Sequence, residues 1–208
     1  MRNTNPPDER VAIGTDDRFT IEPTPLDGLV VVTRHPRRDE RGSLERLFCE
    51  HDLASLLPAG RRIVQVNRTC TRTPGTIRGM HFQRPPHAEL KIVSCLRGAV
   101  FDVAVDLRPW STTCLEWHGV TLEAEAHTAL VIPEGFAHGF QSLVADTELL
   151  YFHTAAWTAG AEGALHALDP ALAIRWPLPV AAMSDRDRTH PFVAADRRAT
   201  RSTWEEAA

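Results

Sequence analysis

Lysine and tyrosine are almost missing from this chain of 208 residues. Lys91 is the only lysine among 23 basic residues, and Tyr151 is the only tyrosine. The excess of arginine indicates a compositional bias. A single compact ammonium retained in such a chain is notable, because Lys and Arg are not interchangeable where a point charge must reach a buried oxygen. Counts alone do not separate function from accident, so the surrounding motifs must decide.

Cysteine is scarce and irregularly spaced. None of the cysteines forms a CxxC pair or a finger-like pattern, which argues against a zinc finger or a common redox motif. They are Cys49, Cys70, Cys95 and Cys114. We interpret them as reduced, mostly buried thiols of a cytosolic protein.

Long runs of like charge and long runs of apolar residues are also lacking. The net charge is −4 and the arginines are scattered, so nucleic-acid binding is not indicated. No apolar run is long enough to span a bilayer, and residues 1–9 are polar rather than signal-like, so we expect a cytoplasmic protein. The length suggests one domain. We expect a flexible arm at 1–17, a folded domain at 18–192 and a flexible tail at 193–208.

Helical periodicity is weak, and the sequence instead predicts short strands separated by turn residues. A brief helix capped by Asp52 is expected to run through Leu57. The pattern of many short strands favours a β-sandwich or barrel, followed by an irregular part from about residue 155. The expected strands cover 29–33, 43–48, 63–69, 92–96, 100–107, 117–122, 129–132, 139–144 and 149–153.

Two strands carry polar residues on one face. Gln65 and Asn67 share a face of the expected strand at 63–69, since alternate residues point the same way. Asp102 and Asp106 share a face of the strand at 100–107, where they either support histidines or pair with Arg108.

Two histidine motifs stand out. The first is Arg78-Gly79-Met80-His81-Phe82-Gln83, and histidine is the side chain that most readily exchanges protons near neutral pH. The second is Pro133-Glu134-Gly135-Phe136-Ala137-His138, a turn that leads into a strand. This Pro-x-Gly-x-x-His pattern resembles the second motif of the cupins, which are small jelly-roll barrels with a site in the lumen.

The metal-binding signature of many cupins is absent. There is no His-x-His pair, and a cation at Lys91 would repel a metal, so we predict no catalytic metal. Most remaining histidines are expected at the surface or in packing contacts: His35, His51, His118, His127, His153, His166 and His190.

Together with further short segments that serve as landmarks, the two histidine motifs make the chain resemble the dTDP-4-dehydrorhamnose 3,5-epimerase family from about Gly28 to Phe192. The resemblance implies a mainly β, cupin-type jelly-roll barrel (double-stranded β-helix) with short peripheral helices. The landmarks occur in family order: 39–42, 65–67, 77–83, Lys91, 100–108, 132–140, Leu150-Tyr151, Asp169-Pro170, 174–177 and 184–187.

The resemblance implies an enzyme without cofactor that acts on a dTDP-4-keto-6-deoxyhexose. A carbon beside a ketone becomes acidic only when its enolate is stabilised, so the site needs a base, a cation at the oxygen and an acid on the opposite face. His81 matches the base and Asp187 its partner. Lys91 matches the oxyanion stabiliser, and Tyr151 matches the acid.

Other matched positions would bind the substrate. Arg41, Gln65, Asn67 and Arg78 match residues that hold the sugar and diphosphate, since two arginines suit two phosphates. His138 matches a second lumen histidine. The resemblance further implies a homodimer in which the Arg41 region reaches the partner's barrel.

The chain also departs from the family pattern. Arg46 stands where a glutamate is usual, Ala156-Trp157 replaces a tyrosine pair, and Ala167 replaces a tryptophan. Trp157 could still stack on the thymine. These changes leave open the base, the sugar, and whether C3, C5 or both are inverted. The alternatives are a mono-functional epimerase, a 3,4-ketoisomerase, a non-catalytic sugar-nucleotide-binding barrel and a metal-dependent oxygenase.

Overall fold

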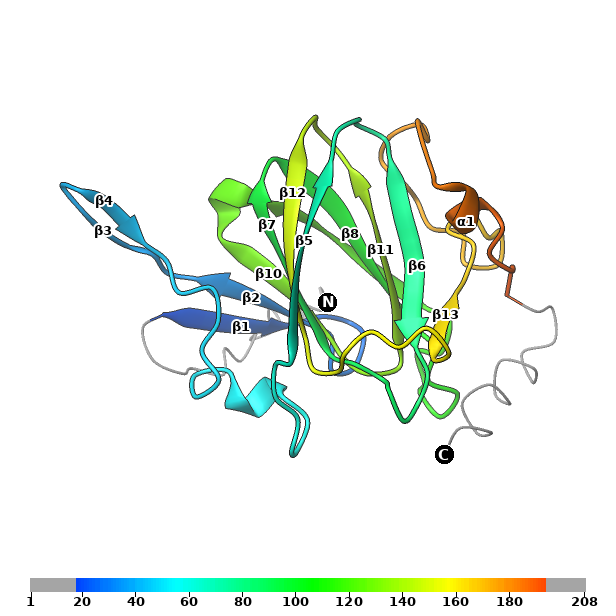
Figure 1. Ribbon diagram of the computed structural model, residues 1–208, viewed down its shortest axis with the longest axis horizontal. Helices are drawn as coiled ribbons and strands as arrows, with labels where there is room; N and C mark the ends of the chain where they lie inside the picture. Colours follow the sequence, from blue (N-terminus) through cyan, green and yellow to red (C-terminus); the bar gives the residue numbers. More distant parts are fainter. Residues whose placement is uncertain (1–17, 194–208) are drawn as a thin grey trace, which may run out of the picture.

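Two antiparallel sheets face each other in the computed structural model, which describes residues 18–193 (Figure 1). The expected arm at 1–17 and all but the first residue of the expected tail at 193–208 lie outside the described residues. The larger sheet has the order β1 (Phe19–Pro23), β2 (Val30–Arg34), β10 (Thr128–Ile132), β7 (Lys91–Arg97), β12 (Thr147–His153) and β5 (Gln65–Thr71). The smaller has the order β13 (Glu162–Ala164), β6 (Ile77–Gln83), β11 (Phe136–Ser142), β8 (Ala99–Asp106) and β9 (Trp117–Glu123). The predicted jelly-roll fold of the cupin type is confirmed.

The smaller elements lie around these sheets. A hairpin of β3 (Arg37–Asp39) and β4 (Gly42–Leu44) projects away from both of them, as Figure 1 shows. The other short elements are the 3-10 turns η1 (Ala54–Leu56) and η2 (Ala124–Ala126) and the helix α1 (Asp185–Arg188).

Two expectations in this region are wrong. The strand expected at 43–48 ends at Leu44, and the helix expected from Asp52 is only a 3-10 turn whose cap residue is Leu53. The Asp52 carboxylate binds Arg46 at 2.7 Å instead of capping the turn, because an ion pair with a nearby guanidinium competes for its oxygens.

Because side chains alternate between the two faces of each strand, the buried apolar residues form three packed layers. Between the sheets, Val93 of β7, Leu130 of β10 and Leu149 of β12 meet Ala104 of β8 and Phe140 of β11. Side chains of opposite parity face outward, since successive residues of a strand alternate between its two faces. Residues that share the parity of this inner set therefore point into the barrel.

Both outer faces are covered as well. Val103 and Val105 of β8 pack beneath the C-terminal segment, against Leu165 and Leu172. The outer face of the larger sheet packs against 47–63 and includes Ile92. The apolar face of β8 therefore lies outside the barrel, and its Asp102 face lies inside.

Strand β6 is not among the strands that periodicity predicts, because it carries Arg78 and His81 and contains Gly79. Gly79 has φ +128°, and a Cβ there would lie 2.5 Å from the Cα of Gly139. Glycine is required where two backbones approach this closely. The register of β6 and β11 shifts at this point and pairs His81 with His138. No helix among residues 18–193 is long and apolar enough to cross a membrane.

Candidate functional site

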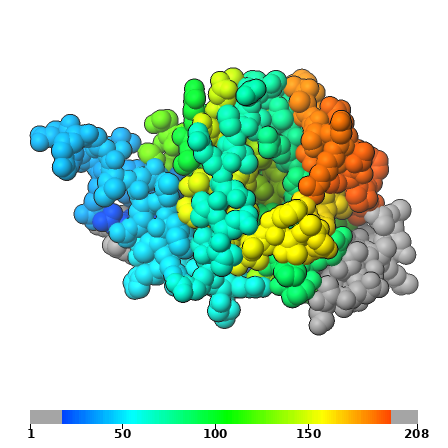
Figure 2. Space-filling model, in the orientation of Figure 1, coloured from blue at the N-terminus to red at the C-terminus, as the bar shows by residue number. Residues whose placement is uncertain are grey.

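A cavity of about 620 Å³ opens between the two sheets. It lies between the blue-green strands β5 and β6 and the orange C-terminal segment of Figure 2. Except for Arg41, every predicted site residue lines it: Gln65, Asn67, Arg78, His81, Lys91, His138, Tyr151, Trp157 and Asp187. Period-2 alternation explains this convergence, since Lys91 shares the inward parity of Val93 and Tyr151 that of Leu149.

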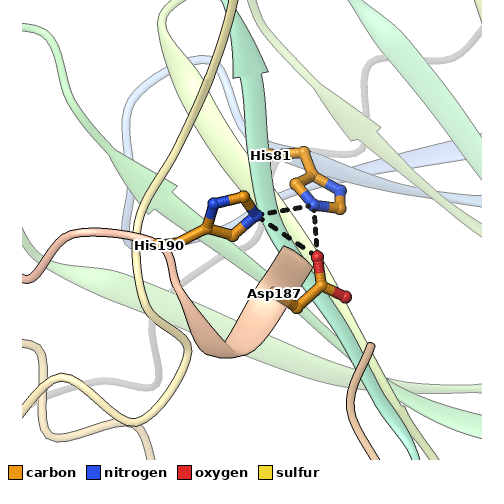
Figure 3. Close-up of side chains that lie close together, drawn as sticks. All are labelled: His81, Asp187 and His190. Atoms are coloured by element: carbon orange, nitrogen blue, oxygen red, sulfur yellow. Dashed lines mark hydrogen bonds and ion pairs between the residues drawn. The ribbon is translucent and has the colours of Figure 1, made fainter. Parts of the chain in front are cut away.

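His81 and Asp187 form a hydrogen-bonded pair on one wall. His81 Nε2 lies 2.9 Å from Asp187 Oδ1, and His190 Nε2 lies 3.3 Å from the same oxygen (Figure 3). The α1 helix holds Asp187 in place, because its first turn is capped by Ser184 Oγ, which accepts from Asp187 N at 3.0 Å.

The charge state of this pair follows from its surroundings. Burial opposes ionisation of Asp187, but the hydrogen bond from His81 and the charges around it outweigh burial and lower its pKa. An ionised carboxylate only accepts hydrogen bonds. His81 Nε2 must therefore carry a proton, and in the neutral ring the lone pair lies on Nδ1. For His190, burial and the neighbouring His81 lower the pKa.

His138 forms a second histidine–carboxylate pair. Its Nε2 lies 2.8 Å from Asp102 Oδ1, and both side chains are buried. Asp106 does not reach a histidine and binds Arg108 instead, at 2.8 Å. Of the two roles that the sequence left open for this face of β8, Asp102 therefore supports a histidine and Asp106 pairs with Arg108.

Tyr151 lies on the opposite wall, on β12 of the larger sheet. Its ring centroid lies 6.0 Å from that of His138. Burial, reinforced by the charge of Asp102, raises the pKa of the phenol. The side chain therefore remains protonated at neutral pH and can donate a proton or a hydrogen bond.

Lys91 lies next to a third histidine–carboxylate pair. Its Nζ lies 3.2 Å from Glu89 Oε1 and 3.3 Å from the backbone oxygen of His81. Glu89 Oε2 lies 2.8 Å from His153 Nδ1. Burial of Glu89 is outweighed by the hydrogen bond from His153 and the charge of Lys91, which lower its pKa. The single ammonium of the chain thus points into the cavity with its charge partly balanced.

Polar residues and an aromatic ring surround the cavity mouth. Gln65 Oε1 accepts from Trp157 N at 3.0 Å, and Asn67 Nδ2 lies 3.4 Å from His153 Nε2. Trp157 is 58% exposed, and its indole N–H donates to Glu162 Oε2 at 3.1 Å. An exposed ring in this position offers a flat surface for stacking.

Arg41 lies elsewhere. It is on the projecting hairpin, where it pairs with Asp39 at 2.6 Å in solvent. One chain alone does not bring this arginine to the cavity, so its place in a substrate site remains a prediction that requires a second copy.

Sequence analysis missed three residues of the site. His153 and His190 are expected only as surface or packing residues, but His153 lines the cavity, stacked on Tyr151, and His190 contacts the His81–Asp187 pair. The third residue is Glu89, which contacts both Lys91 and His153. A usable signal existed for His153, which follows Tyr151 by two residues on β12 and therefore shares its strand face. Glu89 precedes β7, which begins at Lys91, so strand alternation does not place it.

Comparison with known proteins identifies the family of the chain. The family model for dTDP-4-dehydrorhamnose 3,5-epimerase matches residues 23–195. A dTDP-4-dehydrorhamnose 3,5-epimerase of Streptomyces griseus is 34% identical over 188 residues, 89% of this chain and 93% of the relative. A dTDP-4-dehydrorhamnose 3-epimerase of Streptomyces niveus is 34% identical over 85% of each chain.

A solved structure extends the likeness to the fold. The dTDP-6-deoxy-D-glucose-3,5-epimerase of Legionella pneumophila, in complex with dTDP-4-keto-L-rhamnose, has a TM-score of 0.80 and 36% identity. The match covers 88% of this chain and 96% of that chain. On sequence and fold together, the chain belongs to the dTDP-4-dehydrorhamnose 3,5-epimerase family.

Proposed function

We propose that this protein epimerises a dTDP-4-keto-6-deoxyhexose at C3, C5 or both. The observation that carries the proposal is the placement of His81 and Tyr151 on opposite sheets of one cavity, with Lys91 beside it. Inverting a carbon requires removing a proton from one face of the sugar ring and returning one to the other face. A base and an acid on facing walls provide this arrangement.

The proposed steps follow from the charge states of these groups. His81 Nδ1 takes the proton from the carbon next to the ketone, and the bonding electrons move to the ketone oxygen. The imidazolium is stabilised by ionised Asp187, and the resulting enolate by the Lys91 ammonium. Tyr151, which is held protonated, then donates a proton to the opposite face of the carbon.

Solvent exchange provides the test. The protein is incubated with dTDP-4-keto-6-deoxyglucose in deuterated water, and the sugar is followed by NMR. Deuterium at C3 and C5 with inversion supports double epimerisation, whereas label at one carbon supports a mono-epimerase. His81→Ala should abolish exchange, while His51→Asn, at a solvent-exposed position, should not change it. Absence of exchange with this sugar and close analogues would refute the proposal.

A mono-epimerase is the second candidate. It is favoured by the Streptomyces niveus relative, whose name specifies inversion at C3 alone. A 3,4-ketoisomerase would move the carbonyl instead, and the same NMR spectra would show the ketone carbon at a new position. The exchange experiment therefore separates all three reactions.

We further propose that the active form is a cytoplasmic homodimer in which Arg41 reaches the partner's cavity. The hairpin leaves Leu44 68% exposed, and the edge strand β5 leaves Val66 53% exposed, so both offer apolar surface for a second copy. Arg41→Ala should raise KM through loss of a diphosphate contact. Sedimentation of the wild-type protein as a monomer would exclude the dimer.

A further inference from the structure

His190 completes a cluster that the proposed reaction does not use. The ligand atoms of His81, Asp187 and His190 all lie within 4.8 Å of one another. Figure 3 shows the three side chains converging in a triangle, with a dashed line joining each pair. Two imidazoles and one carboxylate form a donor set that suits zinc, cobalt and other divalent transition metals.

We propose that His81, Asp187 and His190 form a site for a divalent transition-metal ion, and that an ion bound there blocks the transfer of a proton to His81. The site itself stands on the arrangement of these residues alone. Its effect on catalysis rests on the proposed function.

The spacing of the donors supports the site. Ligands at about 2.0–2.1 Å from one ion lie about 3.4 Å apart in a tetrahedron and about 3.0 Å apart in an octahedron. His190 Nε2 lies 3.4 Å from His81 Nε2 and 3.3 Å from Asp187 Oδ1. The third separation, from His81 Nε2 to Asp187 Oδ1, is 2.9 Å. A single ion therefore requires only small side-chain adjustments.

The surroundings leave room for such an ion. His81 and Asp187 line the cavity, so water or another ligand can occupy the open coordination positions. Two of the cationic side chains that line the cavity are already paired with a carboxylate. Arg186 binds Glu162 at 2.5 Å, and Lys91 binds Glu89 at 3.2 Å. The Asp187 carboxylate thus remains available to balance the charge of a metal.

Metal binding and catalysis compete for the same ring. A neutral imidazole that coordinates a metal through Nε2 carries its proton on Nδ1. His81 in that state has no lone pair to accept a proton from the substrate. An occupied site would therefore leave the fold and the substrate pocket intact while removing the base.

The experiment measures binding first. Protein freed of metal with a chelator is titrated with Zn²⁺ alone by calorimetry and with Co²⁺ by visible absorption. We expect one equivalent to bind, with His190→Asn weakening the affinity at least about 10-fold, because a ligand is lost. His51→Asn serves as the matched control, since that histidine is exposed and also adjoins an aspartate. Mg²⁺ should not bind, because it prefers oxygen ligands.

Two further measurements keep the proposal testable if His190→Asn folds poorly. Anomalous diffraction from wild-type crystals soaked in Zn²⁺ should place an ion among the three side chains. Zn²⁺ should also inhibit isotope exchange by the wild-type enzyme, with full recovery after chelation. No saturable binding, equal affinity in His190→Asn, or an ion located elsewhere would overturn the site.

The outcomes also separate this proposal from the proposed function. Zinc binding by a protein that shows no isotope exchange even without metal would support the site and count against the epimerase assignment. Isotope exchange that is insensitive to saturating zinc would keep the assignment and refute the inhibitory role.

Discussion

Replacing Asp187 with asparagine removes a charge from the catalytic wall while nearly preserving its shape. Asp187 Oδ1 accepts from His81 Nε2 at 2.9 Å, which fixes the lone pair of the ring on Nδ1. The amide group of asparagine can instead donate to Nε2, and the ring proton then moves to Nδ1. The variant thus favours a tautomer that cannot act as the base, and it no longer stabilises the imidazolium.

The size of the expected loss in exchange rate follows from these two effects. General base catalysis contributes about 10²–10⁴-fold to a rate, so Asp187→Asn should lower the rate constant for isotope exchange by about this factor. Binding should change little, because we propose that other residues hold the sugar nucleotide. The assay measures the rate of deuterium incorporation by NMR under saturating substrate, together with KM.

A matched control lies on the same helix. Asp185 is exposed and lies two residues before Asp187, so Asp185→Asn removes an equal charge without touching His81. We expect its exchange rate to stay within about a factor of two of the wild-type rate, because surface charges are screened by salt. If Asp187→Asn behaves like this control, the proposed dyad has no catalytic role.

Three further predictions concern the remaining walls. Tyr151→Phe should retain proton removal but lose inversion, seen as label that returns to the original face, and inverted product at wild-type rates would exclude Tyr151 as the acid. His138→Asn should lower the free energy of unfolding in urea by about 1–3 kcal/mol, because it removes the imidazole that hydrogen-bonds the buried Asp102 carboxylate, and an unchanged denaturation midpoint would count against that pair. Because the pKa values of Asp187 and Glu89 are lowered in the folded state, the folded state binds fewer protons than the unfolded state. The contribution of these two carboxylates to the free energy of unfolding is therefore fully present above their unfolded pKa values of 3.8 and 4.5. It disappears as the pH falls through the lower folded values. Glu89→Gln should therefore flatten the acid side of the stability curve, as measured by thermal unfolding between about pH 2 and 6, and an unchanged slope would contradict the assigned shift.

Much of the site was predictable because its residues occur in short motifs on strands. Alternation alone places Gln65 beside Asn67, and Tyr151 beside His153, on common faces. The alternation of β8 did not reveal which face is the lumen. Its apolar face packs beneath the C-terminal segment, and that contact becomes visible only when the chain has folded over the smaller sheet.

Long-range pairs could not be read from spacing. His81 and Asp187 are 106 residues apart, and His138 and Asp102 are 36 apart. No periodic pattern connects such positions, since their meeting depends on how two sheets and a terminal helix pack. For the same reason His190 gave no local signal, although it lies only three residues from Asp187.

The sequence by itself determined most of the strands, the two histidine motifs and the single ammonium and phenol, because these depend on residue type and local alternation. Tertiary structure decided which wall each group occupies, which carboxylate holds each histidine, and that Arg41 lies away from the cavity of its own chain. The physical reason is that hydrogen bonds between side chains require contact within about 3 Å. Only the packing of the two sheets brings residues so distant in sequence to that separation.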